Sequence, residues 1–241
     1  MNILAAFSDF VYPRQCELCG AAVDRPGRHV CAACLMRLPF VGPAGCCRLC
    51  GRSATGASQD YVCVDCRGRN RPCFDAATSA LRFEGAARQM LLDYKFRRGL
   101  WLREDLVDYL EAAVRMRFRP EEVDVVVPLP LSAWHRYDRG YNQSEEFARS
   151  LARRLDRRLV ASALVRCGNP RRQSTLSEDE RRENARNSVA VRRPADVRGR
   201  TVLVVDDIMT TGATLSECAR VLKASGAFRV WCATVARSVR S

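Results

Sequence analysis

The stretch VLVVDDIMTTGATL, residues 202–215, decides the fold. It begins with a continuous apolar run, which is typical of a strand that is buried on both faces of a sheet, and we expect that strand to span 201–207. Two adjacent carboxylates, Asp206 and Asp207, end the predicted strand. A short loop rich in hydroxyl groups then leads directly into a run with the apolar spacing of a helix. This order of strand, acidic pair, loop and helix predicts an α/β fold.

The loop before the predicted helix has the chemistry of a phosphate-binding site. A helix N-terminus offers unpaired amides and a positive dipole end, while Thr210, Thr211 and Thr214 add hydroxyl donors and Gly212 closes the loop. The two carboxylates would repel a phosphate, so we expect them to face hydroxyl groups or a metal ion. A sugar with two free hydroxyls and a 5-phosphate meets both demands. We therefore predict a ribose 5-phosphate site, and we call residues 210–214 the phosphate loop.

Three other interpretations of the acidic pair fit less well. A Walker B element requires a partner GxxxxGK[ST] loop, but the residues before the chain's lysines, Lys95 and Lys223, are Tyr94 and Leu222. A dinucleotide-binding fold requires GxGxxG after a strand, and the sequence contains none. Acids that merely end a strand would not need the hydroxyl-rich loop and the immediate helix that follow here.

The rest of the body alternates between apolar strands and helical patterns. Asn142 stands where a helix cap is expected, and Pro120 follows the end of another helical run. Continuous apolar strands between helices predict a parallel sheet that is covered on both faces and binds ligands at the carboxyl ends of its strands. The further strands are expected at 76–83, 123–128 and 228–237, and the helices at 87–96, 102–118, 142–155 and 213–226.

The N-terminal part of the chain is rich in cysteine. Ten of the 13 cysteines lie between Cys16 and Cys73. Two CxxC turns supply the four sulfur ligands of a tetrahedral zinc site, so the spacing predicts structural zinc, specifically two ions. A disulfide framework would need an oxidising compartment, and we recognise no secretory signal. The expected ligands are four CxxC pairs in order: Cys16 with Cys19, Cys31 with Cys34, Cys47 with Cys50, and Cys63 with Cys66.

These patterns divide the chain into two expected domains. Residues 1–73 would form a short helix and a double zinc-ribbon module that folds on metal binding, and residues 74–241 would form the α/β body. No stretch approaches the roughly 20 apolar residues of a membrane span, so we expect no membrane insertion and a cytoplasmic location. The net charge of +13 is compatible with nucleic-acid binding, although an excess of arginine over lysine also fits a GC-rich genome.

The acidic pair and phosphate loop resemble the phosphoribosyl pyrophosphate motif of type I phosphoribosyltransferases. The whole chain resembles the ComF/GntX family, which joins a cysteine-rich zinc element to a phosphoribosyltransferase-like domain. The resemblance implies a type I phosphoribosyltransferase-like parallel sheet with flanking helices, preceded by a small N-terminal zinc-ribbon module with four-cysteine metal sites. It also implies that Asp206 and Asp207 hold the ribose 2- and 3-hydroxyls. The implied contacts of the 5-phosphate are Thr210, Thr211, Gly212, Ala213 and Thr214.

Three further stretches resemble this family. Residues 127–148 are similar to its pyrophosphate-loop region, residues 171–191 to its mobile loop, and residues 94–99 to an early segment that carries Lys95. Charged residues in these stretches are equally compatible with a solvated surface. The candidates that the resemblance implies for the pyrophosphate and the lid are Leu129, Pro130, Arg136, Arg139 and Arg181.

The resemblance implies an enzyme that binds phosphoribosyl pyrophosphate with Mg²⁺ and transfers phosphoribosyl to an unknown acceptor. It also implies a link to DNA uptake in natural transformation, with single-stranded DNA and a helicase as partners, although GntX-type relatives are linked to gluconate use. The alternative is a non-catalytic nucleic-acid-binding or adaptor protein whose pocket senses a phosphoribosyl ligand. A third hypothesis is a zinc-stabilised scaffold with a disused pocket.

Overall fold

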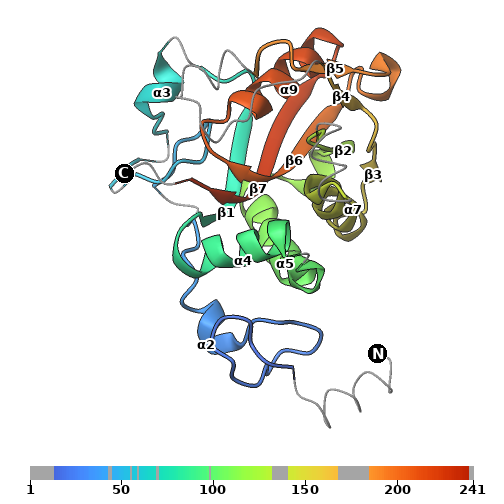
Figure 1. The fold of residues 1–241 in the computed structure, drawn as a ribbon. Helices are drawn as coiled ribbons and strands as arrows, with labels where there is room; N and C mark the ends of the chain where they lie inside the picture. The colour runs from blue at the N-terminus through green and yellow to red at the C-terminus, as the bar shows by residue number, and fades with distance from the viewer. Residues whose placement is uncertain are drawn as a thin grey trace.

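The computed structural model describes residues 14–42, 45–54, 56–58, 60–68, 71–97, 99–131, 141–167 and 185–238. Within these residues the centre is a parallel sheet in the order β1-β7-β6-β2-β3 (Figure 1). The antiparallel strands β4 and β5 form a separate two-stranded sheet. The bounds are β1 Ala76–Arg82, β2 Val125–Pro128, β3 Arg158–Leu159, β4 Leu164–Arg166, β5 Val189–Val191, β6 Thr201–Met209 and β7 Arg229–Arg237.

Helices cover both faces of the main sheet, as predicted. Successive strand residues point to opposite faces, so Leu203 and Val205 of β6 pack with α4, α5 and α7, whereas Val202 and Val204 pack with α9. None of the helices in the described ranges has the length and apolar character that crossing a membrane requires. The helical bounds are α2 Ala32–Leu35, α3 Val64–Arg67, α4 Gly85–Phe96, η1 Leu100–Leu102, α5 Arg103–Arg117, η2 Pro120–Glu122, α7 Gln143–Leu155, η4 Pro194–Asp196 and α9 Ala213–Ala224.

The predicted elements of the body are present with small shifts at their ends. Asn142 caps α7 as expected, because its side-chain oxygen accepts a hydrogen bond from the backbone N–H of Ser144 at 3.2 Å. Strand β6 runs on to Met209, so the acidic pair lies within the strand rather than at its end. Strands β3, β4 and β5 were not predicted, since two or three residues are too few to show a strand periodicity.

The two cysteine groups lie in different places on the body. The first cysteine group (Cys16, Cys19, Cys31 and Cys34) is next to α5, and the second (Cys47, Cys50, Cys63 and Cys66) lies beyond β1 (Figure 1). Arg28 Nε donates to Asp108 Oδ2 at 2.6 Å and the backbone N–H of His29 donates to Asp105 Oδ2 at 2.8 Å, which docks the first group on α5. Each group therefore makes its own contacts with the body, and the domain boundary after residue 73 stays a prediction.

The N-terminal segment also covers the outer edge of β1. The backbone N–H of Val41 donates to Ala80 O at 2.8 Å, and the backbone N–H of Ala77 donates to Leu49 O at 2.7 Å. Gly51 has a φ of +69°, and a Cβ at this position would lie 2.8 Å from Ala77 O. Only glycine allows both this conformation and this close approach, so the turn of the second group is tied to β1.

Candidate functional site

The acidic pair of β6 faces two helices. Ser144 Oγ, in the first turn of α7, donates to Asp206 Oδ1 at 2.8 Å. Lys95 Nζ, near the end of α4, lies 2.9 Å from Asp207 Oδ2. Helices α4 and α7 pack on the same face of the sheet, and each supplies a partner to one of the two carboxylates. Segments that are distant in sequence thus meet at the carboxyl end of β6, where open α/β sheets bind their ligands.

The environment of Asp206 favours its protonated form. Burial raises the pKa of Asp206 to about 7, and the neighbouring charge of Asp207 adds to this rise. The hydrogen bond from Ser144 and the charge of Lys95 act in the opposite direction and lower the pKa. Asp206 can therefore gain or lose a proton near neutral pH, which makes it responsive to a ligand that brings hydroxyl groups or a cation.

The phosphate loop connects β6 to α9 through a left-handed residue. Gly212 is the N-cap of α9 with a φ of +77°, a conformation that glycine adopts without a steric penalty. The backbone N–H of Ala213 donates to Thr211 Oγ1 at 3.3 Å, which orders the turn. Thr210 is exposed, and the rest of the loop, up to Thr214, is partly exposed. The five predicted phosphate contacts thus lie together at a helix N-terminus, a position that favours an anion.

The predicted pyrophosphate and lid residues are only partly within the described residues. Leu129 follows β2, and its backbone N–H donates to Val205 O at 2.8 Å beside the end of β6. The carbonyl of Leu129 accepts from Asn142 Nδ2 at 3.1 Å, and Pro130 is buried. Leu129 and Pro130 are therefore near the acidic pair. Three candidates lie outside the described residues: Arg136, Arg139 and Arg181.

Two polar contacts of the site were not predicted. Lys95 belongs to a stretch that resembles the family, but its ion pair with Asp207 could not be seen in the sequence. The contact of Ser144 with Asp206 could not be predicted from the capping residue Asn142 alone, because it depends on how α7 packs against β6. The Tyr141 hydroxyl donates to Tyr94 O at 2.7 Å and holds the end of α4 near the start of α7.

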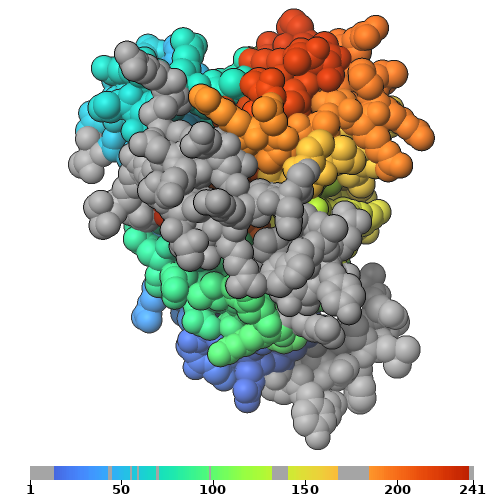
Figure 2. Space-filling model, turned by 45° about the horizontal axis from the view of Figure 1, so that its top comes forward, coloured from blue at the N-terminus to red at the C-terminus, as the bar shows by residue number. Residues whose placement is uncertain are grey.

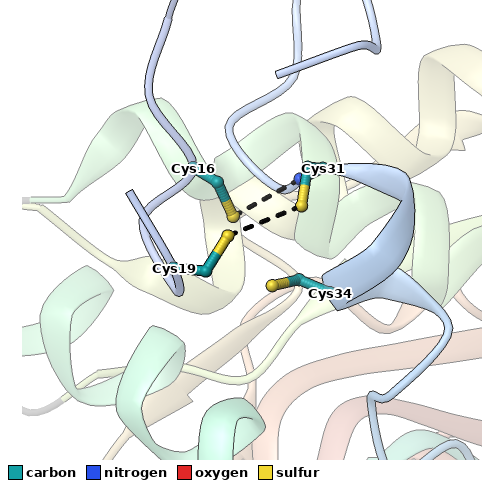
Figure 3. A group of neighbouring side chains, drawn as sticks. All are labelled: Cys16, Cys19, Cys31 and Cys34. Atoms are coloured by element: carbon teal, nitrogen blue, oxygen red, sulfur yellow. Dashed lines mark hydrogen bonds between the residues drawn. The ribbon is translucent and has the colours of Figure 1, made fainter. Parts of the chain in front are cut away.

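Both cysteine groups have a geometry that fits zinc. The four sulfur atoms of each group lie within 4.8 Å of one another, and those of the first group point toward a common centre (Figure 3). The sulfurs of Cys19 and Cys31 are 3.7 Å apart, as are those of Cys50 and Cys63. A tetrahedral site with Zn–S bonds of about 2.3 Å separates its sulfurs by about 3.8 Å. The two groups therefore fit one structural zinc ion each.

Backbone donors support the thiolate ligands in both groups. The backbone N–H of Cys31 donates to Cys16 Sγ at 3.4 Å, and that of Cys63 donates to Cys47 Sγ at 3.3 Å. Such hydrogen bonds stabilise sulfur in its negatively charged form. Cys46 takes no part in the second group, because its Sγ donates to Gly42 O at 3.1 Å.

A cavity of about 450 Å³ lies between the second cysteine group and the start of α9. Its lining includes Cys50 and Cys66 of the second cysteine group and Thr211, Gly212 and Ala213 of the phosphate loop. The segments that carry these residues lie in the upper part of Figure 2. The second cysteine group is therefore part of the surroundings of the phosphate loop.

Comparisons with known proteins match both parts of the chain. The model of the phosphoribosyl transferase domain matches residues 142–240, and that of the double zinc ribbon domain matches residues 7–67. Competence protein F of Haemophilus influenzae is 26% identical over 226 residues, which cover 90% of this chain and 95% of the relative. Competence protein ComFC of Bacillus subtilis is 29% identical over 210 residues, which cover 84% and 81% of the two chains. Over most of its length the chain is therefore similar to competence protein F and to ComFC.

Other similarities cover less of the chain. The DNA utilization protein YhgH of Escherichia coli K12 is 35% identical over 111 residues, and the match spans about half of that relative, 48% of its length, and 45% of this chain. A solved purine phosphoribosyltransferase from Pyrococcus horikoshii covers 57% of this chain and 74% of its own, with 17% identity and a TM-score of 0.37. A structural similarity of this size does not support a conclusion about function.

Proposed function

We propose that this protein belongs to the ComF family, binds phosphoribosyl pyrophosphate with Mg²⁺ and transfers its phosphoribosyl group to an acceptor. The observation that carries the proposal is the position of Asp206 and Asp207, four residues or fewer before the loop that starts α9. Two carboxylates beside a helix N-terminus match a ligand with hydroxyl groups next to a phosphate. The family relation supports the same class of ligand.

The acidic pair and the phosphate loop would bind the two ends of the ribose 5-phosphate. Asp206 and Asp207 accept hydrogen bonds from the 2- and 3-hydroxyls, because ionised carboxylates are acceptors only. The amides of the loop and the hydroxyls of Thr210, Thr211 and Thr214 donate to the 5-phosphate. This division keeps the carboxylates away from the phosphate and fixes the direction of the sugar.

The pyrophosphate would lie beside Leu129 and Pro130, which follow the neighbouring strand β2. The arginines Arg136, Arg139 and Arg181 are the proposed partners of its charge, since guanidinium groups form charge-assisted hydrogen bonds with phosphate. Carboxylate oxygens are ligands that Mg²⁺ accepts, so Asp206 fits a role in holding the ion together with oxygens of the donor. Bound Mg²⁺ would neutralise charge on the leaving pyrophosphate.

The proposed reaction is a displacement at the anomeric carbon of the ribose. The bond from this carbon to the pyrophosphate oxygen breaks with its electron pair on the oxygen, and a bond to the acceptor nucleophile forms. The ring carries positive charge in such a transition state, by analogy with glycosyl transfer. The negative charge of the acidic pair would favour this ring, and Lys95 limits the repulsion between the two carboxylates.

Calorimetric titration of zinc-loaded protein with phosphoribosyl pyrophosphate and Mg²⁺ tests the proposal. We expect saturable binding that is lost when Asp206→Asn and Asp207→Asn are combined. The matched control combines Asp60→Asn with Glu121→Gln, two exposed positions that give the same change in charge. Absence of binding by folded wild-type protein would refute the donor site. If the protein binds the donor, pyrophosphate release in the presence of candidate acceptors tests transfer.

A second candidate function is the binding of single-stranded DNA, with a helicase as a further partner. Relatives carry the names competence protein and DNA utilization protein, and this chain has a net charge of +13. Arg149, Arg153 and Arg157 line one concave surface at the end of α7. Binding that weakens steeply with salt and persists in the Asp206→Asn, Asp207→Asn protein would support this function.

We further propose a cytoplasmic location. None of the 13 cysteines forms a disulfide in the structure; eight of them form the two zinc-type groups, and the other five are free thiols. Free thiols persist in a reducing compartment. Fractionation of cells that express the native protein would test this location, and recovery outside the cytoplasm would contradict it.

A further inference from the structure

Arg237 is a buried arginine at the end of β7. The residue is only 5% exposed, and no carboxylate of the described residues forms an ion pair with its guanidinium group. The guanidinium instead donates to Cys50 O through Nη1 and lies 3.5 Å from Cys50 Sγ through Nη2. Arginine stays charged in proteins. The negative group that it meets is therefore a sulfur of the second cysteine group.

A zinc ion with four thiolate ligands carries a net charge of about −2, which would more than offset the positive charge of this arginine. Two positive charges from the metal and four negative charges from the sulfurs leave that sum. Arg52 lies on the same side, but Arg52 Nη2 is paired with Asp65 Oδ2 at 2.6 Å. Among the described residues of the α/β body, Arg237 is thus the cation that contacts a sulfur of this group.

The same guanidinium contacts the base of the phosphate loop. Nη1 of Arg237 lies 3.0 Å from the sulfur of Met209, the last residue of β6, and the two residues are paired in register across β6 and β7. A Cβ on Gly212 would lie 3.5 Å from that same sulfur. Met209 therefore supports the left-handed turn of the loop from below, and Arg237 supports Met209.

A second link joins the cysteine-rich segment to α9. The backbone N–H of Cys73 donates to Ser216 Oγ, in the first turn of α9, at 2.9 Å. Phe74 follows directly, and a Cβ on Gly212 would lie 3.8 Å from its ring. The first cysteine group has contacts of another kind, because Arg28 and Asp108 dock it on α5. The two groups are thus predicted to differ in their effect on the phosphate loop.

We propose that Arg237 is a positioning residue through which the second zinc centre holds the phosphate loop in its binding conformation. Zinc in the second group, and not zinc in the first, then sets how tightly the loop is ordered and how well it binds phosphate. The effect on affinity rests on the proposed binding of phosphoribosyl pyrophosphate, whereas the effect on loop order does not.

The test compares full-length Arg237→Met, Arg237→Lys, Cys66→Ser and Cys34→Ser with wild-type protein. Cys66 is a ligand of the second group that does not contact Arg237 in the structure, and Cys34 is the matched ligand of the first group. Zinc content comes from metal analysis, loop order from amide hydrogen exchange over residues 209–216, and affinity from calorimetry with phosphoribosyl pyrophosphate and Mg²⁺.

We expect exchange in the loop to accelerate about tenfold or more in Arg237→Met and Cys66→Ser, with an intermediate effect in Arg237→Lys, which keeps the charge. Affinity should fall in the same order, while Cys34→Ser loses one zinc ion and keeps both loop order and affinity. A folded Arg237→Met protein with wild-type exchange would overturn the proposal. Equal changes in loop exchange in Cys34→Ser and Cys66→Ser would also overturn the proposal. If Arg237→Met does not fold, this comparison of the two cysteine variants is the deciding test. If wild-type protein does not bind phosphoribosyl pyrophosphate, the proposed function is wrong. The role of Arg237 in ordering the loop is then tested by the hydrogen-exchange data alone.

Discussion

Lys95 Nζ lies 2.9 Å from Asp207 Oδ2, and the two side chains are only 15% and 12% exposed. This ion pair brings a cation from α4 to the acidic pair of β6. One lysine beside two adjacent carboxylates leaves the site with one more negative than positive group, and Asp206 is the carboxyl whose pKa is raised. The balance among these three residues gives the site a dependence on pH.

Replacement of Lys95 should weaken ligand binding at pH 7. The charge of Lys95 lowers the pKa of Asp206, so Lys95→Met should raise that pKa further and reduce the ionised fraction. We expect affinity for phosphoribosyl pyrophosphate to fall about fivefold, which is the loss of ionised fraction at pH 7 when a pKa of about 7 rises by about one. Lys95→Arg should stay close to wild type. Lys223→Met, which breaks the exposed pair with Asp75, is the matched control, and an equal loss in both Met variants would contradict this prediction.

Affinity should rise with pH as Asp206 ionises. With a pKa of about 7, the carboxylate fraction of Asp206 grows about tenfold between pH 6 and pH 8. Ser144→Ala removes a hydrogen bond that lowers this pKa, so the midpoint of the profile should move to higher pH. Calorimetry across this range checks both expectations. Asp206→Asn should abolish the part of the rise that belongs to this residue, and an unchanged slope in this variant would show that the ligand's own phosphates cause it.

The stability of the ligand-free protein should depend on Asp206 with the opposite sign. The pKa of Asp206 is raised to about 7 in the folded chain, whereas an unfolded aspartate titrates near about 3.9. The folded state therefore binds more protons between these values, and the free energy of unfolding should fall as pH rises toward 7. Urea unfolding at pH 6 and pH 8 measures the difference. It should shrink in Asp206→Asn, and a difference of the same size in that variant would assign it to other groups.

Each chain should bind two zinc ions. Metal analysis of wild-type protein should give two ions per chain, because each cysteine group offers four sulfurs within 4.8 Å. Cys34→Ser and Cys66→Ser should each lose one ion, and combining them should remove both. Cys46→Ser should lose none, since Cys46 belongs to neither group. One ion in wild-type protein, or loss of metal in Cys46→Ser, would contradict this assignment.

The first cysteine group should depend on the ion pair between Arg28 and Asp108. Burial opposes ionisation of Asp108, but hydrogen bonds from Arg28 and Arg154 outweigh it and lower its pKa. A double-mutant cycle with Arg28→Met and Asp108→Asn should give a coupling of about 1 kcal/mol in urea unfolding at pH 7. The more exposed helical pair of Glu145 and Arg149 should give about 0.3 kcal/mol. Equal couplings would mean that the docking contact adds nothing beyond an ordinary surface pair.

The local features of the site could be predicted from the sequence because short-range rules control them. The apolar run, Gly212 and the helical spacing after it predicted β6, the phosphate loop and α9. CxxC spacing predicted both cysteine groups, and the polar side chain of Asn142 predicted the start of α7. In each case the residues that interact lie within one element or one turn, apart from the CxxC turns of one cysteine group, which follow each other directly along the chain.

The contacts between elements could not be predicted in the same way. Ser144 and Asp206 are 62 residues apart, and their meeting depends on how α7 packs against β6. The ion pair of Lys95 with Asp207 depends likewise on the position of α4. The spacing of the cysteines also did not predict that the two groups dock at different places. Their docking depends on contacts with α5 and with the edge of β1 rather than on the cysteines.

The cover over the edge of β1 has a consequence for the fate of the chain without metal. An uncovered strand edge presents free N–H and C=O groups that can pair with another chain. Here Val41, in the linker between the two cysteine groups, and Leu49, within the second group, form hydrogen bonds with that edge. Zinc starvation would loosen this cover and leave β1 open to strand exchange between copies. We therefore expect zinc in the second cysteine group, whose residue Leu49 contacts this edge, to protect the protein from aggregation.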